Sequence, residues 1–329
     1  MTGDLPTIAA SGLGPLPGRD PRDAAGWVLD VLADDVPHLP QLPDRGPWAG
    51  DVARSAALLV DLPVEVAVDR WQVAARPGRD LRRAGATLAE DLDAFEEHWA
   101  ERTSPAKVQV LGPWSLAAAV ERRSGEALAA DPGAVTDVAA SLAEGVAGHV
   151  ADLRRRLVGL TGLVVTLDEP ALPALLSGSV PTRSGLSRLA PLDPGAAARL
   201  LGVVVDAVRA AGAQVVVATS HDDAAVTVAR QAGADGWCGD LGAPDVPLDS
   251  LGAWVDQGAR VVAACDVLAG RDPATAASLR ARWRRWGLRL GAAPVLVVAR
   301  APVDLTRDVA RDAYREAVTT ARRLRDEEG

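Results

Sequence analysis

The sequence predicts a single parallel (β/α)8 barrel that occupies residues 1–329. Three observations support this prediction. Eight short apolar or β-branched segments alternate with helical patterns, most of those segments are apolar along their whole length, and the composition does not change along the chain. Continuously apolar strands are typical of a parallel sheet that is covered on both faces. Such barrels contain from about 200 to more than 400 residues in one domain, so we expect one domain.

The predicted strands are Thr7–Ala10, Val64–Val68, Lys107–Leu111, Leu163–Leu167, Gln214–Thr219, Gly236–Gly239, Arg260–Cys265 and Val295–Ala299. The sixth has the weakest pattern. Longer insertions follow the first four strands. We expect the segments His38–Gly50 and Leu176–Arg188 to lie as loops over the top of the barrel.

Four predicted helices have a well-marked start. Each is preceded by an Asp-Pro pair, in which the aspartate accepts hydrogen bonds from free N–H groups of the first turn and the proline loses nothing at the first helical position. The pairs Asp20-Pro21, Asp131-Pro132, Asp193-Pro194 and Asp272-Pro273 precede the helices Ala24–Ala33, Val135–Val158, Ala196–Ala211 and Ala274–Trp286. A last helix, Arg307–Arg325, is expected to start at a Thr306 cap.

The composition excludes several classes of protein. A net charge of −9 opposes binding to nucleic acid. No basic segment followed by a long apolar segment marks a secretion signal at the amino terminus, and no apolar run approaches the roughly 18 residues that span a bilayer. The two cysteines, Cys238 and Cys265, fall within predicted strands and are interpreted as small buried apolar residues. A cytoplasmic protein without nucleic-acid or membrane partners is therefore expected. The single lysine, Lys107, is attributed to a compositional preference for arginine.

Candidate catalytic residues follow the strands, where (β/α)8 barrels place their active sites. Asp168 and Glu169 end the fourth strand, and alternation directs one of them toward the barrel axis. Asp240 and Asp266 end the sixth and seventh strands. With Asp168 they would form an acidic mouth suited to a cation or an amine. The alternative is that these carboxylates cap helices or form ion pairs.

His221 is the fifth candidate and follows the fifth strand. A histidine there could bind a metal or move protons. However, Asp222 and Asp223 come next, which is typical of a helix start, so a polar first-turn residue is the favoured interpretation. The sequence contains no Cys-x-x-Cys and no His-x-Cys spacing, and we predict no metal ligands.

Three segments at strand ends resemble the catalytic barrel of cobalamin-independent methionine synthases. Ser11–Pro17 is similar to that family's Ile-Gly-Ser-Phe-Pro, with Gly14 and Pro17 in common and Pro15 in place of a homocysteine-binding serine. Gly112-Pro113-Trp114-Ser115-Leu116 resembles its Gly-Pro-Val-Thr-Ile. Asp168-Glu169-Pro170-Ala171-Leu172 matches its Asp-Glu-Pro-Ala-Leu, whose aspartate contacts the amino group of homocysteine. Short actinobacterial single-barrel relatives look closer still. The resemblance implies that Gly14, Pro15, Trp114 and Asp168 bind an amino-acid-like substrate.

The family's zinc site is degenerate in this sequence. Alignment places Ala218, Ser220, Asp240 and Pro302 where the family has its histidine, cysteine, glutamate and second cysteine. Alanine and proline side chains have no donor atom, so we expect the zinc to be absent. The cofactor is otherwise unknown, and either a folate or a corrinoid could be the methyl donor.

Two functions remain open at this point. The first is a methionine-synthase-like enzyme of methionine and one-carbon metabolism, in which methyl transfer to the thiol of homocysteine is impaired or altered. The second is a zinc-less, non-enzymatic descendant that binds an amino-acid-like ligand or a protein partner. A barrel of the uroporphyrinogen decarboxylase type is a weaker third option, because the arginine-rich amino-terminal signature of that family is not present.

Overall fold

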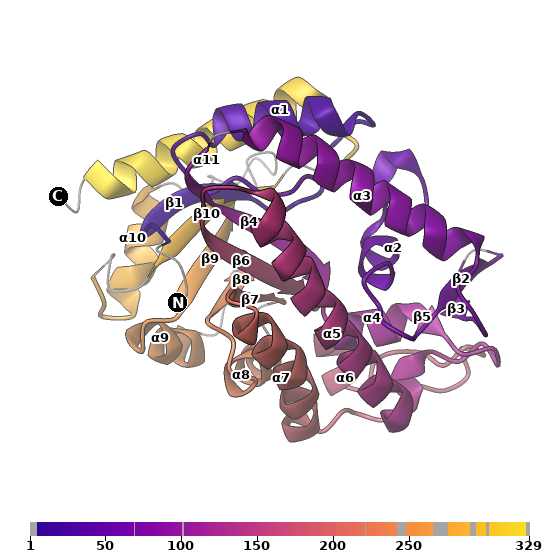
Figure 1. Ribbon diagram of the computed structural model, residues 1–329. Coiled ribbons are helices and arrows are strands. Elements are labelled where there is room, and N and C mark those ends of the chain that lie inside the picture. Colours follow the sequence, from indigo (N-terminus) through magenta and orange to yellow (C-terminus); the bar gives the residue numbers. More distant parts are fainter. Residues whose placement is uncertain are drawn as a thin grey trace.

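The computed structural model describes residues 5–68, 70–100, 102–220, 222–241, 248–265, 276–289, 294–300 and 303–326 (Figure 1). The strands are β1 (Ile8–Gly12), β2 (Val64–Ala67), β3 (Arg70–Val73), β4 (Ser104–Leu111), β5 (Val120–Glu121), β6 (Leu160–Asp168), β7 (Gln214–Ala218), β8 (Gly236–Gly239), β9 (Arg260–Cys265) and β10 (Val295–Ala299). The helices are α1 (Pro21–Val31), α2 (Asp51–Ala56), α3 (Arg79–Trp99), α4 (Pro113–Ala119), α5 (Pro132–Arg156), α6 (Leu172–Leu176), α7 (Pro194–Ala210), α8 (Asp223–Gln231), α9 (Leu248–Asp256), α10 (Ala276–Arg285) and α11 (Arg307–Asp326), with short 3-10 turns at Pro43–Arg45 and Leu128–Ala130.

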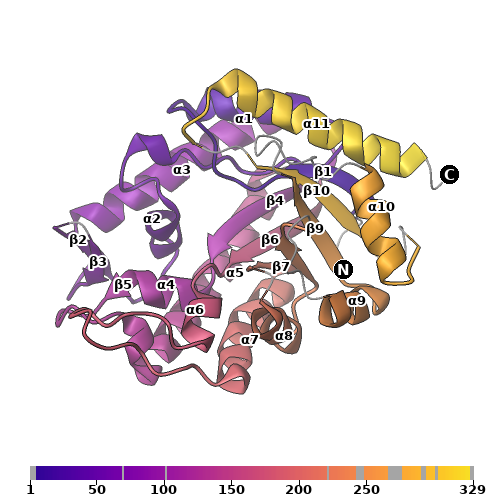
Figure 2. The same ribbon diagram turned by 180° about the vertical axis from the view of Figure 1, so that it is seen from behind.

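The predicted barrel is confirmed. Within the described ranges, seven parallel strands pair in the order β1-β10-β9-β8-β7-β6-β4, and helices surround them (Figures 1 and 2). Seven of the eight predicted strands lie in this sheet, including the short sixth one. In the same part of the chain, none of the helices is both long enough and apolar enough to cross a membrane.

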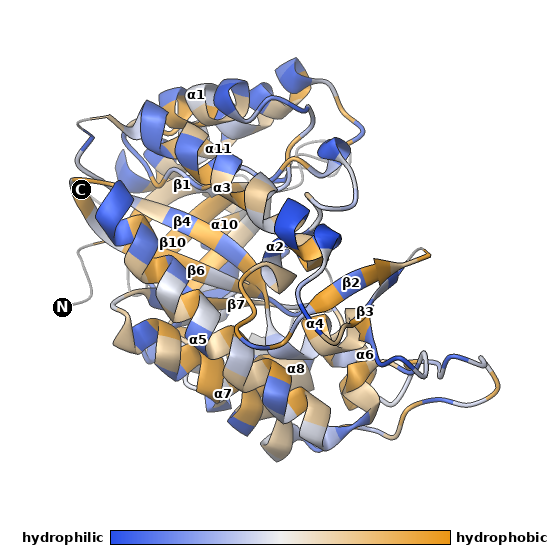
Figure 3. Ribbon diagram, turned by 45° about the vertical axis from the view of Figure 1, so that its right-hand side comes forward, coloured by the Kyte–Doolittle hydropathy of each residue, from blue (hydrophilic) through white to orange (hydrophobic). Residues whose placement is uncertain are grey.

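The prediction for the second barrel strand is wrong. Val64–Ala67 pairs with β3 in a separate sheet, whose strand order is β2-β3-β5. Of its four residues only Val64 is buried, because apolar and polar residues alternate there as in a sheet with one face in solvent. Figure 3 shows the β2–β3 hairpin projecting from the barrel.

The segment Val36–Gln41 instead lies between β1 and β4. Val36 N–H donates to Ala10 O at 3.0 Å, Leu39 N–H donates to Lys107 O at 3.0 Å, and Lys107 N–H donates to Pro37 O at 2.8 Å. Prolines supply no backbone donor and limit the ladder to isolated bridges. The first residues of the expected His38–Gly50 loop thus belong to the barrel wall.

The helix starts follow the Asp-Pro prediction. Helices α1, α5 and α7 begin at the prolines, and the side chains of Asp20, Asp131 and Asp193 accept hydrogen bonds from first-turn N–H groups. Asp272 lies outside the described residues. On α10, Trp283 is buried, whereas Arg284 and Arg285 are exposed.

The barrel has an inner and an outer core. The inner core contains small and branched side chains from successive strands, such as Ala9, Val164, Val216 and Val298. The larger, outer core lies between the strands and the helices and holds most of the tryptophans. In Figure 3 the strands are largely apolar, whereas the helices carry polar residues on one side. Because the inner core is apolar, the few polar side chains that it contains are candidates for a functional role.

Candidate functional site

The carboxyl ends of the parallel strands open onto one mouth, and Asp168 lies there as the last residue of β6. The register pairs Asp168 with Ala218 and Ala218 with Cys238 on neighbouring strands. Paired residues of parallel strands face the same way, so these three side chains share the inner surface. Asp168 is half-buried, and its carboxylate accepts no hydrogen bond from any residue that the structure describes. An unpaired carboxylate at a barrel mouth can accept hydrogen bonds from a ligand.

A buried lysine lies below Asp168. Lys107 on β4 is fully buried. Its ammonium group donates to Gly12 O at 3.0 Å, to Leu13 O at 3.4 Å and to Gln109 Oε1 at 2.9 Å. Gln109 in turn donates from Nε2 to Leu39 O at 2.9 Å. The lysine therefore ties the loop after β1 to the centre of the barrel.

Burial determines the protonation of these groups. It raises the pKa of Asp168 to about 7, an effect that the Lys107 charge opposes and the nearby Asp51 carboxylate adds to. It lowers the pKa of Lys107, while Cys238 and Asp168 act in the opposite direction. It raises the pKa of Cys238 to about 12. Cys238 is thus a neutral thiol and a poor nucleophile near neutral pH, whereas Asp168 can exchange its proton there.

Glu169 points away from the mouth and caps α4. It is fully buried. Its carboxylate accepts hydrogen bonds from the N–H of Trp114 at 3.0 Å and from the N–H and hydroxyl of Ser115, both at 2.7 Å. Burial raises the pKa of Glu169 to about 7, and these three donors lower it. In this position Glu169 holds the end of β6 against α4, so we treat it as a positioning residue.

The residues expected to bind substrate occupy different places. Gly14 is buried with φ of 129°, and a Cβ there would come within 2.2 Å of the Gln109 side chain, so only glycine fits. Pro15 is exposed at the mouth beside Gln41. The Trp114 side chain is buried toward α7, where its indole N–H donates to Ala197 O at 3.0 Å, and it therefore does not line the mouth.

The remaining candidates are only partly described. Asp240 follows β8 at the same mouth, is half-buried and lies near Arg282 of α10, whose pKa its charge raises while burial lowers it. His221 and Asp266 lie outside the described residues. Asp168 and Asp240 are thus the two predicted acidic residues that the structure places at one mouth.

Several polar residues of this site were not predicted from the sequence. His38 and Tyr314 meet beside Gly12, where Tyr314 OH and His38 Nε2 are 2.7 Å apart. Because His38 Nδ1 lies 3.2 Å from Leu39 O and burial lowers the pKa of His38 to about 3, the ring is neutral and accepts from the tyrosine. Lys107 could have been found: a lone charge within an otherwise apolar strand is unusual, but it was attributed to composition.

The residues at the family's zinc positions do not fit zinc. Ala218 carries only a methyl group, Ser220 is exposed, and Pro302 lies outside the described residues. In the part of the chain that the structure describes, no three histidine, cysteine or acidic side chains are close enough to bind one ion. A stable zinc site needs three or four such donors, so the described residues do not form one by themselves.

Replacing Asp168 with asparagine should stabilise the fold at high pH. With its folded pKa near 7 and an unfolded value of about 3.9, the folded state keeps a proton that the unfolded state loses, so stability falls as pH rises from about 4 to 7. The asparagine variant has no such proton to lose. Its free energy of unfolding should therefore exceed that of the wild type by about 1–3 kcal/mol at pH 8, but by little at pH 4. Urea unfolding at both pH values measures it, with the exposed Asp312→Asn as control. An equal gain at both pH values would contradict the shifted pKa.

Comparison with known proteins supports the fold. No family model and no curated protein matches the sequence. Among solved structures, a B12-independent methionine synthase from Shewanella sp. W3-18-1 in complex with selenomethionine aligns over 97% of this chain and 98% of that chain, with a TM-score of 0.61 and 11% identity. A 2,3-dimethylmalate lyase of the PEP mutase/isocitrate lyase superfamily aligns over 97% of this chain and 84% of that chain, with a TM-score of 0.36 and 13% identity. The chain therefore has the fold of a methionine-synthase-like (β/α)8 barrel.

Proposed function

We propose that this protein is a methionine-synthase-like barrel that binds an amino acid of the methionine or homocysteine type at its mouth, without zinc. The observation that carries the proposal is the unpaired, half-buried carboxylate of Asp168 on the inner surface of β6. An α-ammonium group would supply the missing donors and would hold Asp168 ionised near neutral pH. The methionine synthase of similar fold is described with selenomethionine, which is also an amino acid.

Other polar groups near Asp168 are available to such a ligand. The hydroxyl groups of Ser11 and Thr166 are buried and have no hydrogen-bond partner among the described residues. Thr166 lies two residues before Asp168 on the same strand, and Ser11 is the penultimate residue of β1. Buried hydroxyl groups are costly when unpaired, so a carboxylate or amide ligand group that accepts from them would be favoured.

The described residues do not supply what methyl transfer to a thiol requires. A thiol must be ionised to attack a methyl group, and no three possible zinc ligands lie close together among those residues. The nearby cation, Lys107, already donates to three oxygen atoms, which reduces its effect on a ligand. The proposal is therefore ligand binding in the cytoplasm with little methyl transfer from folate or corrinoid donors, and it favours the non-enzymatic alternative.

Calorimetry with two ligands tests the role of Asp168. L-Methionine should bind the Asp168→Asn variant about ten- to a hundredfold more weakly than the wild type, because a charge-assisted hydrogen bond contributes about 1.5–3 kcal/mol. The analogue that lacks the amino group, 4-(methylthio)butanoate, should bind both proteins alike.

The Asp312→Asn variant controls for a general change of charge, since Asp312 is exposed on α11. If methionine binds the wild type and Asp168→Asn with equal affinity, Asp168 does not contact the amino group and the proposed site is wrong.

A further inference from the structure

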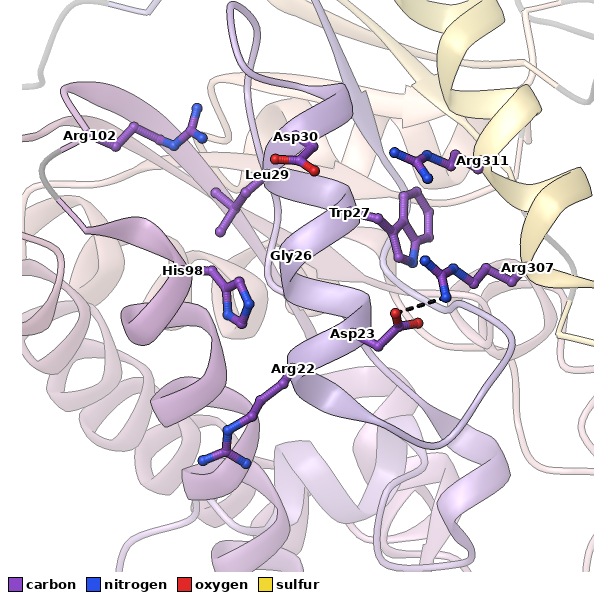
Figure 4. A pocket seen from close by; sticks show the side chains of 10 residues that line it. All are labelled: Arg22, Asp23, Gly26, Trp27, Leu29, Asp30, His98, Arg102, Arg307 and Arg311. Carbon is purple, nitrogen blue, oxygen red and sulfur yellow. Dashed lines mark ion pairs between the residues drawn. The ribbon is translucent and has the colours of Figure 1, made fainter.

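A second candidate site lies on the outer helical layer, outside the barrel. It is a pocket of about 440 Å³ between α1, the end of α3 and the start of α11. Figure 4 shows it from close by: Trp27, Arg307 and Arg311 lie on one side of α1, and His98 and Arg102 lie on the other. Small-molecule sites have volumes of about 300–1,000 Å³, so the pocket could hold a compact ligand. The proposed amino-acid site contains none of its residues.

The pocket wall is mainly cationic. Four arginines line it but only two aspartates, in a chain whose net charge is −9. The arginines are Arg22, Arg102, Arg307 and Arg311. A local excess of positive charge on an acidic protein favours an anionic ligand.

The arginines differ in how their charge is compensated. Arg22 pairs with Glu97 and Arg307 with Asp23, each at 2.8 Å and on the surface. Arg102 donates to Ala33 O at 3.2 Å, which leaves its charge unpaired. Arg311 has no hydrogen bond or ion pair with any residue that the structure describes, and its Nε is buried. A buried N–H without an acceptor is costly, and a bound anion would supply the acceptor.

The start of α11 adds to the positive electrostatic potential of the pocket. Arg307 is the first residue of this helix and Arg311 lies one turn later. Free N–H groups give a helix start a partial positive charge, so these two arginines are placed where cations are disfavoured. An anion in the pocket would offset both the arginine charges and the helix dipole.

We propose that this pocket binds the phosphate group of a small phosphorylated ligand, with Arg311 as the principal contact. Guanidinium groups donate pairs of parallel hydrogen bonds to phosphate oxygens. The volume exceeds what a single phosphate needs, which leaves room for the organic part of the ligand against Trp27. Asp30 lies on the same wall and is exposed, so it limits the affinity.

Calorimetry with inorganic pyrophosphate and with ribose 5-phosphate tests this site, with sodium chloride at matched ionic strength as the reference. One equivalent of each should bind the wild type. Arg311→Gln should weaken binding at least about tenfold, and Asp30→Asn should tighten it several-fold because a repelling charge is removed. Arg315→Gln, one turn further along α11 and exposed, should change neither. Tighter binding of ribose 5-phosphate than of pyrophosphate would identify an organic phosphate as the ligand class.

Two results would overturn the proposal. One is binding of both probes no tighter than that of chloride. The other is equal affinity in Arg311→Gln and Arg315→Gln, because the phosphate would then bind elsewhere. If Arg311→Gln fails to fold, the Asp30→Asn variant still tests the site, because unchanged binding of both probes in that variant would also contradict the proposal. Asp168→Asn should leave phosphate binding unchanged, so failure here does not bear on the amino-acid site.

Discussion

Replacing Asp91 with alanine is expected to lower the free energy of unfolding by about 3–5 kcal/mol. Asp91 on α3 is buried and forms ion pairs with the buried Arg54 of α2 and with Arg45 of the preceding 3-10 turn. Without the carboxylate, the buried Arg54 guanidinium would lose its ion pair, whereas Arg45 would keep its second partner, Glu90. That penalty is far larger than the loss of a surface ion pair, which costs about 0–1 kcal/mol.

Urea unfolding of Asp91→Ala and Asp93→Ala measures this difference. Asp93 lies on the same helix and pairs with Arg156, but its side chain is 60% exposed, so its variant should lose less than about 1 kcal/mol. The result bears on the site as well, because α2 carries Asp51, whose charge raises the pKa of Asp168. Similar losses in the two variants would show that the Asp91 cluster is solvated.

Replacing Glu169 with alanine is expected to cost about 3–5 kcal/mol. The change leaves the N–H groups of Trp114 and Ser115 and the Ser115 hydroxyl without this acceptor in a fully buried region. It also opens a cavity beside Gly112, which lies so close to Glu169 that a Cβ there would overlap its side chain.

A graded series separates the hydrogen bonds from the packing. Glu169→Gln keeps the shape and one accepting oxygen, so its stability should lie between those of the wild type and Glu169→Ala. Glu97→Ala removes an exposed carboxylate with one ion pair and should cost less than about 1 kcal/mol. Equal stability of Glu169→Ala and Glu97→Ala in thermal unfolding would contradict the capping role.

Local signals in the sequence were sufficient for most of the fold. The Asp-Pro pairs determine helix starts through contacts within four residues, and a continuously apolar strand can be recognised without knowing its neighbours. The second strand was predicted wrongly because the true wall segment, Val36–Gln41, is held by long-range hydrogen bonds and contains prolines. Val64–Val68 has the composition of a strand, but it pairs outside the barrel.

The candidate site was only partly predictable for the same reason. Asp168 could be placed because a strand end determines its position, and the family motif pointed to it. Asp168 faces the mouth and Glu169 caps α4. The sequence alone did not separate these two roles, because α4 lies more than 50 residues earlier in the chain. Likewise, two of the three partners of Lys107 are the carbonyl groups of Gly12 and Leu13 at the end of β1, and no local pattern identifies them.

The central claim is that an amino acid binds at the barrel mouth without zinc. It is tested most directly by titrating L-methionine into the protein after chelator treatment, and again after one equivalent of zinc is added. We expect one site with an affinity in the micromolar to millimolar range, or about −4 to −8 kcal/mol, and the same affinity in both titrations. Binding that appears only with zinc, or no binding at about 10 mM methionine, would contradict the claim.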